Sequence, residues 1–286
     1  MHRVPKFLLY PLLALLPALG LALGVTSVAD AGTVGAPGSP PSGGTAAALG
    51  ALRHLLIGWH PTDQQVSTPA LRIRGLSQVK SSNWSGYADT GSGFSTVSGK
   101  WKEPSATCTS TTSLAAFWVG IDGFNSTTVE QDGTLIECNG GIASYFSWWE
   151  MYPTNAIQVV GSTVAPGDSI SASVVRSGTT YTLKLTDSTH PANSFSTIQT
   201  CSSCKNTSAE WIAEAPSDSA GILPLAHFAS WGESGATVTE GTTKGVISSF
   251  TDDEITMVDS AGQVKAQPGA LNVSGNGFSV AWKRST

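Results

Sequence analysis

Charged residues are scarce in this chain of 286 residues, of which only 12% are Asp, Glu, Lys or Arg. The long stretches of Leu, Glu and Lys that are typical of surface helices are also missing after residue 81. The chain is instead rich in Ser, Thr and Gly, and it has nine Trp, nine Phe and five Tyr. Because this aromatic content can fill a core, the bulk of the chain is not disordered. We therefore expect an all-β protein.

Several catalytic signatures are absent as well. The sequence has no GxSxG, no HExxH and no phosphate-binding loop. Beyond residue 80 the only histidines are His190, in a turn-like stretch, and His227, which fits a buried strand. Neither lies near a recognisable nucleophile, which argues against a serine triad. The acidic run at 252–254 is more typical of a solvated loop than of a calcium site. We expect no metal and no cofactor.

The first 29 residues predict a secretory signal. Arg3 and Lys6 are basic, residues 7–25 are apolar, and the small residues at 27–29 offer a cleavage site. The apolar run is about long enough to span a bilayer, so an uncleaved anchor is the alternative. Its prolines and its small-residue end favour cleavage. We expect a secreted, extracellular protein with no stable membrane association after cleavage.

Four cysteines remain in the exported part: Cys108, Cys138, Cys201 and Cys204. In an oxidising compartment two disulfides are the default, and three pairings are possible. Cys201 and Cys204 are close enough in sequence to pair with each other, which leaves Cys108 for Cys138. A CxxC can also be a redox motif or half of a zinc site. No βαβ pattern surrounds this one and no second CxxC exists, so a structural disulfide is favoured.

Charge and composition divide the rest of the chain near residue 80. Residues 30–80 begin with a stretch rich in Gly, Pro and Ala, and their four basic and two acidic residues give a net charge of +2. Residues 81–286 have nine Lys and Arg against 18 Asp and Glu, a net charge of −9. A basic segment ahead of an acidic domain suggests an inhibitory propeptide that acid loosens, with a flexible linker as the alternative. The negative domain argues against nucleic-acid binding.

Residues 81–286 predict strands throughout. The segments at 94–101, 170–174, 180–185 and 278–282 alternate between apolar and polar residues, as half-buried strands do. Turn signals rich in Gly and Pro separate these segments. Many short strands at regular spacing predict one β-sandwich domain.

Aromatic and acidic residues gather in a few of these segments. Because alternate residues of a strand share a face, Trp148, Glu150 and Tyr152 point together, which suits substrate binding. Glu210 shares a face with Ile212, and apolar surroundings raise the pKa of a carboxyl group into the range of an acid/base residue. Taken alone, this pattern fits a salt-bridged surface glutamate better.

Six short motifs resemble those of the glutamic peptidases, or eqolisins, in order and in spacing. They are NWSG at 83–86, FSTVSGKW at 94–101, WVGIDG at 118–123, WWEMYP at 148–153, PGD at 166–168 and AEWI at 209–212. The short CSSC element is closer to bacterial members of that family than to fungal ones. The resemblance implies a concanavalin-like β-sandwich of two seven-stranded antiparallel sheets, with a catalytic Gln and Glu on the concave face.

The same resemblance assigns the catalytic dyad to Gln131 and Glu210. The positions that match residues lining the family's cleft are Trp118, Asp122, Trp148, Glu150 and Tyr152. The loop that leads to Gln131 is one residue shorter than usual, and Asp132 stands where the family has a Thr. Glu130 and Glu214 therefore remain alternative candidates.

The expected activity is that of an acid endopeptidase. Glu210 would take a proton from water and later return it to the leaving amine, while Gln131 would donate a hydrogen bond to the developing oxyanion. The expected partners are protein or peptide substrates and the chain's own propeptide, and we expect a monomer. The main alternative is a secreted carbohydrate-binding module or glycosidase on the same sandwich, since exposed Trp and paired carboxylates also serve sugars. A non-catalytic structural or adhesion domain is the third possibility.

Overall fold

The computed structural model describes residues 77–286. The predicted signal at 1–29 and all but the end of the predicted propeptide at 30–80 lie outside the described residues. Within them the regular structure is strand, apart from two short 3₁₀ helices, η2 (Pro191–Asn193) and η3 (Ile247–Ser249). No helix in this part of the chain is long and apolar enough to cross a membrane. The all-β prediction is confirmed.

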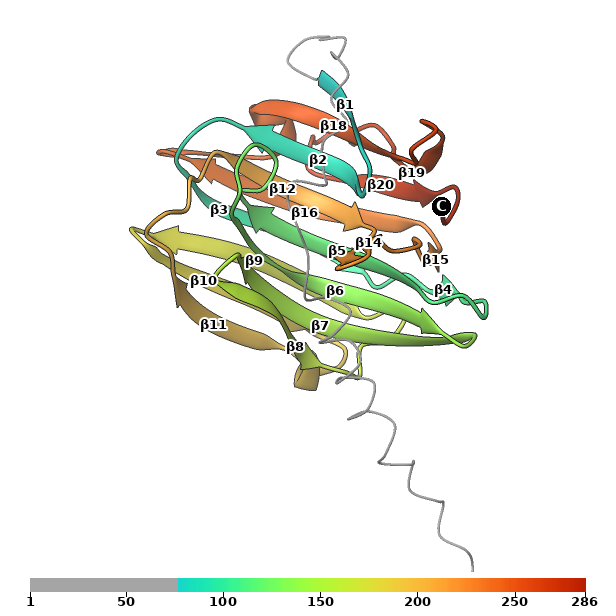
Figure 1. Ribbon diagram of the computed structural model, residues 1–286. Coiled ribbons are helices and arrows are strands. Elements are labelled where there is room, and N and C mark those ends of the chain that lie inside the picture. The colour runs from blue at the N-terminus through green and yellow to red at the C-terminus, as the bar shows by residue number, and fades with distance from the viewer. Residues whose placement is uncertain (1–76) are drawn as a thin grey trace, which may run out of the picture. The chain divides into compact units, whose positions relative to one another are not determined.

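Two layers of strands form the domain (Figure 1). The first layer contains β1 (Ser77–Ser81), β2 (Trp84–Thr90), β5 (Ser113–Ile121), β6 (Val129–Asn139), β7 (Ile142–Tyr152), β8 (Asn155–Gly161), β12 (Ser208–Glu214), β18 (Thr251–Val258), β19 (Val264–Pro268) and β20 (Phe278–Trp282). The second layer contains β3 (Phe94–Lys102), β9 (Ser169–Ser177), β10 (Thr180–Asp187), β11 (Phe195–Thr200), β16 (Trp231–Glu240) and β17 (Thr243–Gly245). Two small ribbons pair β4 (Ala106–Thr107) with β15 (His227–Phe228) and β13 (Ser217–Asp218) with β14 (Gly221–Ile222).

Strand β16 joins the two layers, because its start pairs with β20 and its remainder pairs with β3. The hydrogen-bonded order is therefore continuous: β11-β10-β9-β3-β16-β20-β19-β18-β2-β12-β5-β6-β7-β8. The strands divide unevenly between the layers, and not as two sheets of seven. The named strands pair antiparallel except that β1 runs parallel to β18, so the sheet includes Ser77–Ser81, which lies ahead of the predicted domain start at 81 except for its last residue. The predicted antiparallel β-sandwich is confirmed.

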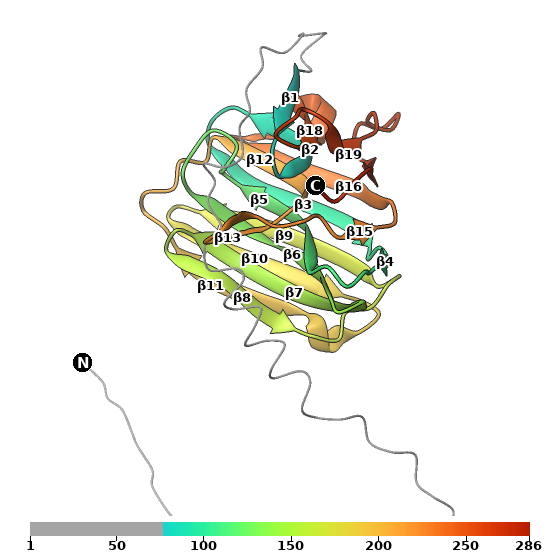
Figure 2. The ribbon, with the colours of Figure 1, turned by 45° about the vertical axis from the view of Figure 1, so that its right-hand side comes forward.

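The core lies between the layers and follows from the alternation in the sequence. In β10, Tyr181, Leu183 and Leu185 are buried, and the residues between them face outward. They join one cluster with residues of the first layer such as Phe117 and Trp211. Burying a large apolar side chain contributes about 1.5–3 kcal/mol, so this cluster holds the layers together. Figure 2 shows the second layer behind β5, β6 and β7.

Both predicted disulfides are present, Cys108–Cys138 and Cys201–Cys204. Two other expectations are wrong. His227 is exposed and stacks on Trp282, with ring centroids 3.9 Å apart, because the two-residue strand β15 turns Phe228 toward the core and His227 away from it. The acidic run at 252–254 is no solvated loop: it lies in β18, where Asp252 and Asp253 are buried.

Candidate active site

Glu210 and Gln131 lie on opposite sides of Gly120, in one row across the first layer. Glu210 on β12 pairs with Gly120 on β5, and Gly120 pairs with Gln131 on β6. Directly paired residues of antiparallel strands project to the same face, so both side chains flank the glycine. Two strand spacings separate their backbones by about 10 Å. With no side chain at Gly120, the two long side chains can approach a common space from either side.

A second row runs beside the first and also has a glycine at its centre. Gly133 on β6 pairs with Trp118 on β5 and with Trp148 on β7. A Cβ at Gly133 would lie 2.7 Å from the Cβ of Trp118, so only glycine fits between the two indoles. Trp118 and Trp148 belong to a cluster separate from the inter-layer core, on the sheet face turned away from the second layer. The candidate site therefore consists of two neighbouring positions without a side chain, Gly120 and Gly133. Polar side chains flank the first and indole rings flank the second.

The amide of Gln131 is held by its neighbour on β7. Its Nε2 donates a hydrogen bond to Oε2 of Glu150 at 2.7 Å. Burial raises the pKa of Glu150 to about 8, and the bond from Gln131 lowers it in part. Oε1 of Gln131 is buried and has no hydrogen-bond partner among the described residues.

Glu210 is completely buried, and neither of its oxygens has a hydrogen-bond partner within the part of the chain that the structure describes. Burial raises the pKa of Glu210 well above its ordinary value, and the charges of Asp122 and Glu130 act in the same direction. The Ser208 hydroxyl and the backbone N–H of Phe124 face the carboxyl group and oppose this shift in part, although neither forms a hydrogen bond of ordinary geometry with it. Buried polar groups without partners are rare in native proteins and mark places where water or a ligand binds. Such groups occur on both sides of Gly120.

Comparison with known proteins shows the family to which the chain belongs. Residues 82–282 match the Peptidase A4 family. The chain belongs to this family of glutamic peptidases, the eqolisins. It is 29% identical to aspergillopepsin-2 of Aspergillus niger over 237 residues, which cover 74% of this chain and 82% of that protein. It is 35% identical to scytalidopepsin B of Scytalidium lignicola over 153 residues, 52% of this chain and 57% of that protein.

Solved structures of glutamic peptidases have the same fold. Scytalido-glutamic peptidase, crystallised with a transition state analog inhibitor, superposes with a TM-score of 0.60 at 28% identity, covering 71% of this chain and 98% of that chain. Aspergilloglutamic peptidase from Aspergillus niger gives a TM-score of 0.52 at 26% identity, covering 60% and 99%. The chain is thus a glutamic endopeptidase, which favours the main prediction over the carbohydrate-binding, glycosidase and adhesion alternatives.

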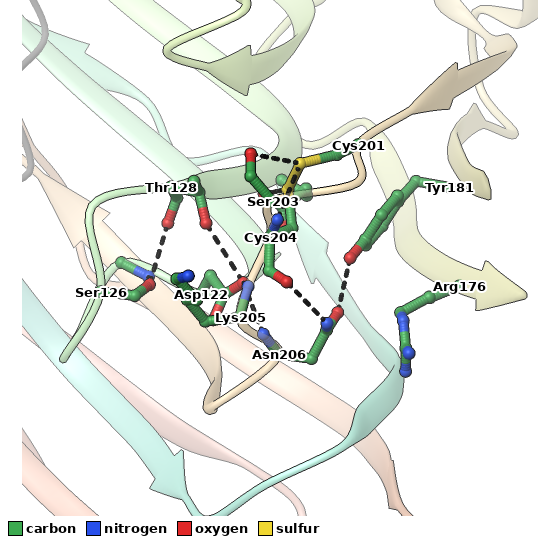
Figure 3. Close-up of a disulfide and its surroundings, with 12 residues drawn as sticks. Asp122, Ser126, Thr128, Arg176, Tyr181, Cys201, Ser203, Cys204, Lys205 and Asn206 are labelled. Atoms are coloured by element: carbon green, nitrogen blue, oxygen red, sulfur yellow. Dashed lines mark hydrogen bonds between the residues drawn. A yellow bond between two sulfur atoms is a disulfide. The ribbon is translucent and has the colours of Figure 1, made fainter. Parts of the chain in front are cut away.

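In this glutamic peptidase Asp122 fastens the loop that leads into β12 (Figure 3). It is buried, adopts a left-handed φ of 69°, and accepts hydrogen bonds from the backbone N–H groups of Lys205, Asn206 and Thr207 at 2.7–2.9 Å. The hydroxyls of Thr128 and Thr207 donate to it as well. Asp122, which was predicted to line the cleft, thus accepts hydrogen bonds that hold the segment before Glu210 in place.

The other predicted residues lie on the same face of the sheet as Gly120, apart from Glu130. Trp118 Nε1 donates to Oε2 of Glu214 at 2.9 Å, and Asn83 Nδ2 donates to the other oxygen at 3.0 Å. Glu214, kept as an alternative to Glu210, thus anchors an indole. Tyr152 is half-buried and packs against the cluster that contains Trp118 and Trp148.

Glu130, kept as an alternative to Gln131, falls in the opposite half of the strand alternation. Its Oε1 lies 2.8 Å from Sγ of Cys204. Burial raises its pKa well above the ordinary value. Successive residues of β6 project to opposite faces of the sheet, so the side chain of Glu130 lies on the face opposite to Gln131.

Two groups of potential metal ligands occur within residues 77–286, and neither includes Gln131 or Glu210. One consists of Glu130, Cys201 and Cys204, but the two sulfurs are joined in a disulfide. The other consists of Asp168, Asp187 and His190, where His190 Nδ1 lies 2.9 Å from the carboxylate of Asp168.

The two central glycines were not recognised from the sequence. Gly120 and Gly133 are single glycines inside strands, and such a residue often marks a close approach of a neighbouring group. The sequence contains these glycines in WVGID and two residues after Gln131. Which groups approach them follows only from the pairing of the strands.

Proposed function

We propose that Glu210 and Gln131 together hydrolyse peptide bonds, with the substrate carbonyl and a water placed in the gap over Gly120. The observation that supports this most is their pairing with the same glycine from opposite sides. Both side chains present buried polar atoms that lack partners among the described residues. The two strand spacings between the backbones of Glu210 and Gln131 leave room for a water and a carbonyl group above Gly120.

Glu210 acts first as the general base and then as the general acid. Its ionised form removes a proton from the water that attacks the carbonyl carbon, and the resulting carboxylic acid gives that proton to the leaving amine. Because the pKa of Glu210 is raised, the ionised fraction at acidic pH is small. Each ionised group is, however, a stronger base than an exposed glutamate.

Gln131 stabilises the charge that develops on the carbonyl oxygen. An amide N–H already fixed in place loses no free energy through reorientation when the tetrahedral intermediate forms. Glu150 supplies that fixation, since it accepts one N–H of the Gln131 amide. The second N–H of the same nitrogen is then the donor for the oxyanion.

The activity is proposed to be greatest well below pH 7. Glu103, Asp132 and Glu233 are buried carboxyl groups, and burial raises the pKa of each one. Ionisation of such groups opposes folding as the pH rises. The fold itself would then limit activity on the alkaline side.

The chain is proposed to be exported by residues 1–29 and kept inactive by a propeptide at 30–80. The supporting observations are the signal pattern and the net charge of +2 in that segment against −9 in the remainder. Strand β1 spans Ser77–Ser81 and pairs with β18. A processing cut that leaves this pairing intact would therefore fall before Ser77.

Hydrolysis of an acid-denatured protein between pH 2 and 8 tests the proposal, with Glu210→Gln as the inactive control. The account expects cleavage with a maximum below pH 7 and release on acidification of a fragment that ends at or before residue 76, so that the pairing of β1 with β18 stays intact. A maximum at neutral or alkaline pH would refute the acid assignment. Cleavage by the Glu210→Gln protein would refute the catalytic one.

A further inference from the structure

The outer face of the second layer has almost no acidic residues, although the domain as a whole is acidic. Strands β3, β9 and β11 contain no Asp or Glu, and the only one in β10 is Asp187, which is fully buried. Lys100, Lys102 and Lys184 are exposed on the same strands. These four strands thus have three exposed lysines and no exposed carboxylate, in a domain with a net charge of −9, and the neighbouring β16 adds only the buried Glu233 and the half-buried Glu240.

A groove of about 720 Å³ crosses this face where β16, β3, β9 and β10 lie side by side. One row of paired residues, Ser234, Lys100, Ser171 and Thr186, runs across it. Lys102 lies two residues from Lys100 on the same strand, so the two ammonium groups project from one face about 7 Å apart along the strand. Nζ of Lys102 is held at 2.5 Å from the hydroxyl of Ser169, which also lines the groove.

The carboxyl groups nearest to the groove are turned inward. Glu233 is 3% exposed and accepts the backbone N–H of Lys100, and Asp187 accepts the backbone N–H groups of Thr189 and His190. Asp168 is buried and pairs with His190. None of these carboxyl groups forms a described ion pair with Lys100 or Lys102, so both ammonium groups are available to a ligand.

We propose that this groove binds a linear polysaccharide with carboxylated sugar units and so holds the exported enzyme on an acidic matrix. The two lysines offer charge to the carboxylates, and the row of Ser and Thr hydroxyls offers hydrogen bonds to the sugar hydroxyls. The aromatic ring lining the groove, Trp101, is only 3% exposed, so the stacking that neutral sugars require is missing. A nucleic acid fits less well, because the acidic remainder of the domain repels so dense a polyanion.

Binding of the enzyme to polygalacturonate at pH 5 tests this proposal, with dextran and single-stranded DNA as parallel probes. We expect polygalacturonate to be retained at 20 mM salt and released at 0.5 M salt, because exposed charges are screened. The Lys100→Gln/Lys102→Gln variant should bind about tenfold more weakly, as expected for the loss of two exposed ion pairs. Its protease activity and melting temperature should stay unchanged.

The Lys205→Gln/Lys283→Gln variant is the matched control, because it removes the same charge from exposed positions outside the groove. It should bind polygalacturonate within about twofold of the wild type. If both variants bound polygalacturonate equally weakly, net charge alone would explain the binding, and the proposal would be overturned. So would an absence of binding at low salt, or tighter binding of DNA or dextran. None of these results bears on catalysis, which is measured separately on a protein substrate.

Discussion

The amide Nε2 of Gln131 lies 2.7 Å from Oε2 of Glu150, on the neighbouring strand of the same sheet. This contact fixes which end of the amide carries the donors. It also leaves the oxygen of Gln131 without a partner among the described residues. An oxyanion donor acts best when its direction is set before the charge appears. We therefore propose that Glu150 positions the Gln131 amide.

Replacing Glu150 by Ala should lower kcat by about 10- to 100-fold and leave KM nearly unchanged, because the Gln131 amide loses its anchor. Glu150→Gln keeps an acceptor oxygen at the same place and should recover most of the activity. Steady-state kinetics at pH 4 on a peptide substrate separate the two variants. Equal kinetics for Glu150→Ala and the wild type would show that the contact does not position the amide.

Removing Gln131 itself should cost more. Gln131→Ala deletes the proposed oxyanion donor, and loss of one such donor typically reduces kcat by about 100- to 1,000-fold. The melting temperature at pH 4 should change little, because Gln131 packs beside a gap. A variant with kcat within threefold of the wild type would place the oxyanion donor elsewhere.

The gap at Gly120 can be filled with a single methyl group. A Cβ there would lie 2.9 Å from Trp118 and 3.2 Å from Cβ of Gln131. Gly120→Ala should therefore reduce kcat/KM by at least about tenfold by crowding the space between the proposed catalytic side chains. Gly232→Ala is the control, since its added Cβ would meet no atom within 4 Å. If both variants kept full activity, the gap would not be where the substrate carbonyl lies.

Much of the fold could be predicted from the sequence, because alternation reports directly on which residues face the core. Segments such as 180–185 alternate clearly and form strands, and Glu210 and Ile212 do share a face, as predicted. His227 was misjudged because a two-residue edge strand has no alternation to evaluate. The acidic run at 252–254 looked like a loop because three charges in succession usually face water.

The candidate site was harder to predict than the fold. Short motifs pointed to Gln131 and Glu210, but their common partner Gly120 depends on the register of three strands. Register is a long-range property, because it pairs Glu210 with a glycine 90 positions earlier in the sequence. The carboxylate of Asp122 was expected in the cleft, and the sequence carries no sign that it binds the 205–207 loop.

Stability should fall as the pH rises. Burial raises the pKa of Glu103 to about 8 and the pKa of Asp89 to about 9. The folded state holds these protons more tightly than the unfolded chain, so the contribution is complete below about pH 4 and is lost as the pH rises through the folded pKa. Each such group lowers the free energy of unfolding by about 1.4 kcal/mol per pH unit in that window. The free energy of unfolding of a typical domain is only about 5–15 kcal/mol. Because several buried carboxyl groups lower it together, we expect the domain to unfold between about pH 5 and 8.

Thermal unfolding measured from pH 3 to 8 checks this expectation. Glu103→Gln keeps an acceptor for the indole N–H of Trp101 and removes the titration, so its melting temperature should fall less steeply with pH. Asp218→Asn, on the short ribbon β13–β14, should follow the wild type. A stability maximum near pH 7 would contradict the account.

Asp122→Ala should destabilise the loop before β12. It leaves three backbone N–H groups at 205–207 without their acceptor, at a cost of about 2–4 kcal/mol. The melting temperature at pH 4 should fall by about 5–15 °C for a domain of this size. Asp122→Asn retains one acceptor oxygen and should fall less. An unchanged melting temperature in Asp122→Ala would mean that the loop is held by other contacts.

The most direct test of the central claim is the kcat of Glu210→Gln on a peptide substrate at pH 4, with folding verified by circular dichroism. This change keeps the size of the side chain and removes the group that takes and returns the proton. The account predicts a loss of at least about 1,000-fold with an intact fold. A kcat within tenfold of the wild type would contradict the proposal that Glu210 and Gln131 catalyse the reaction across Gly120.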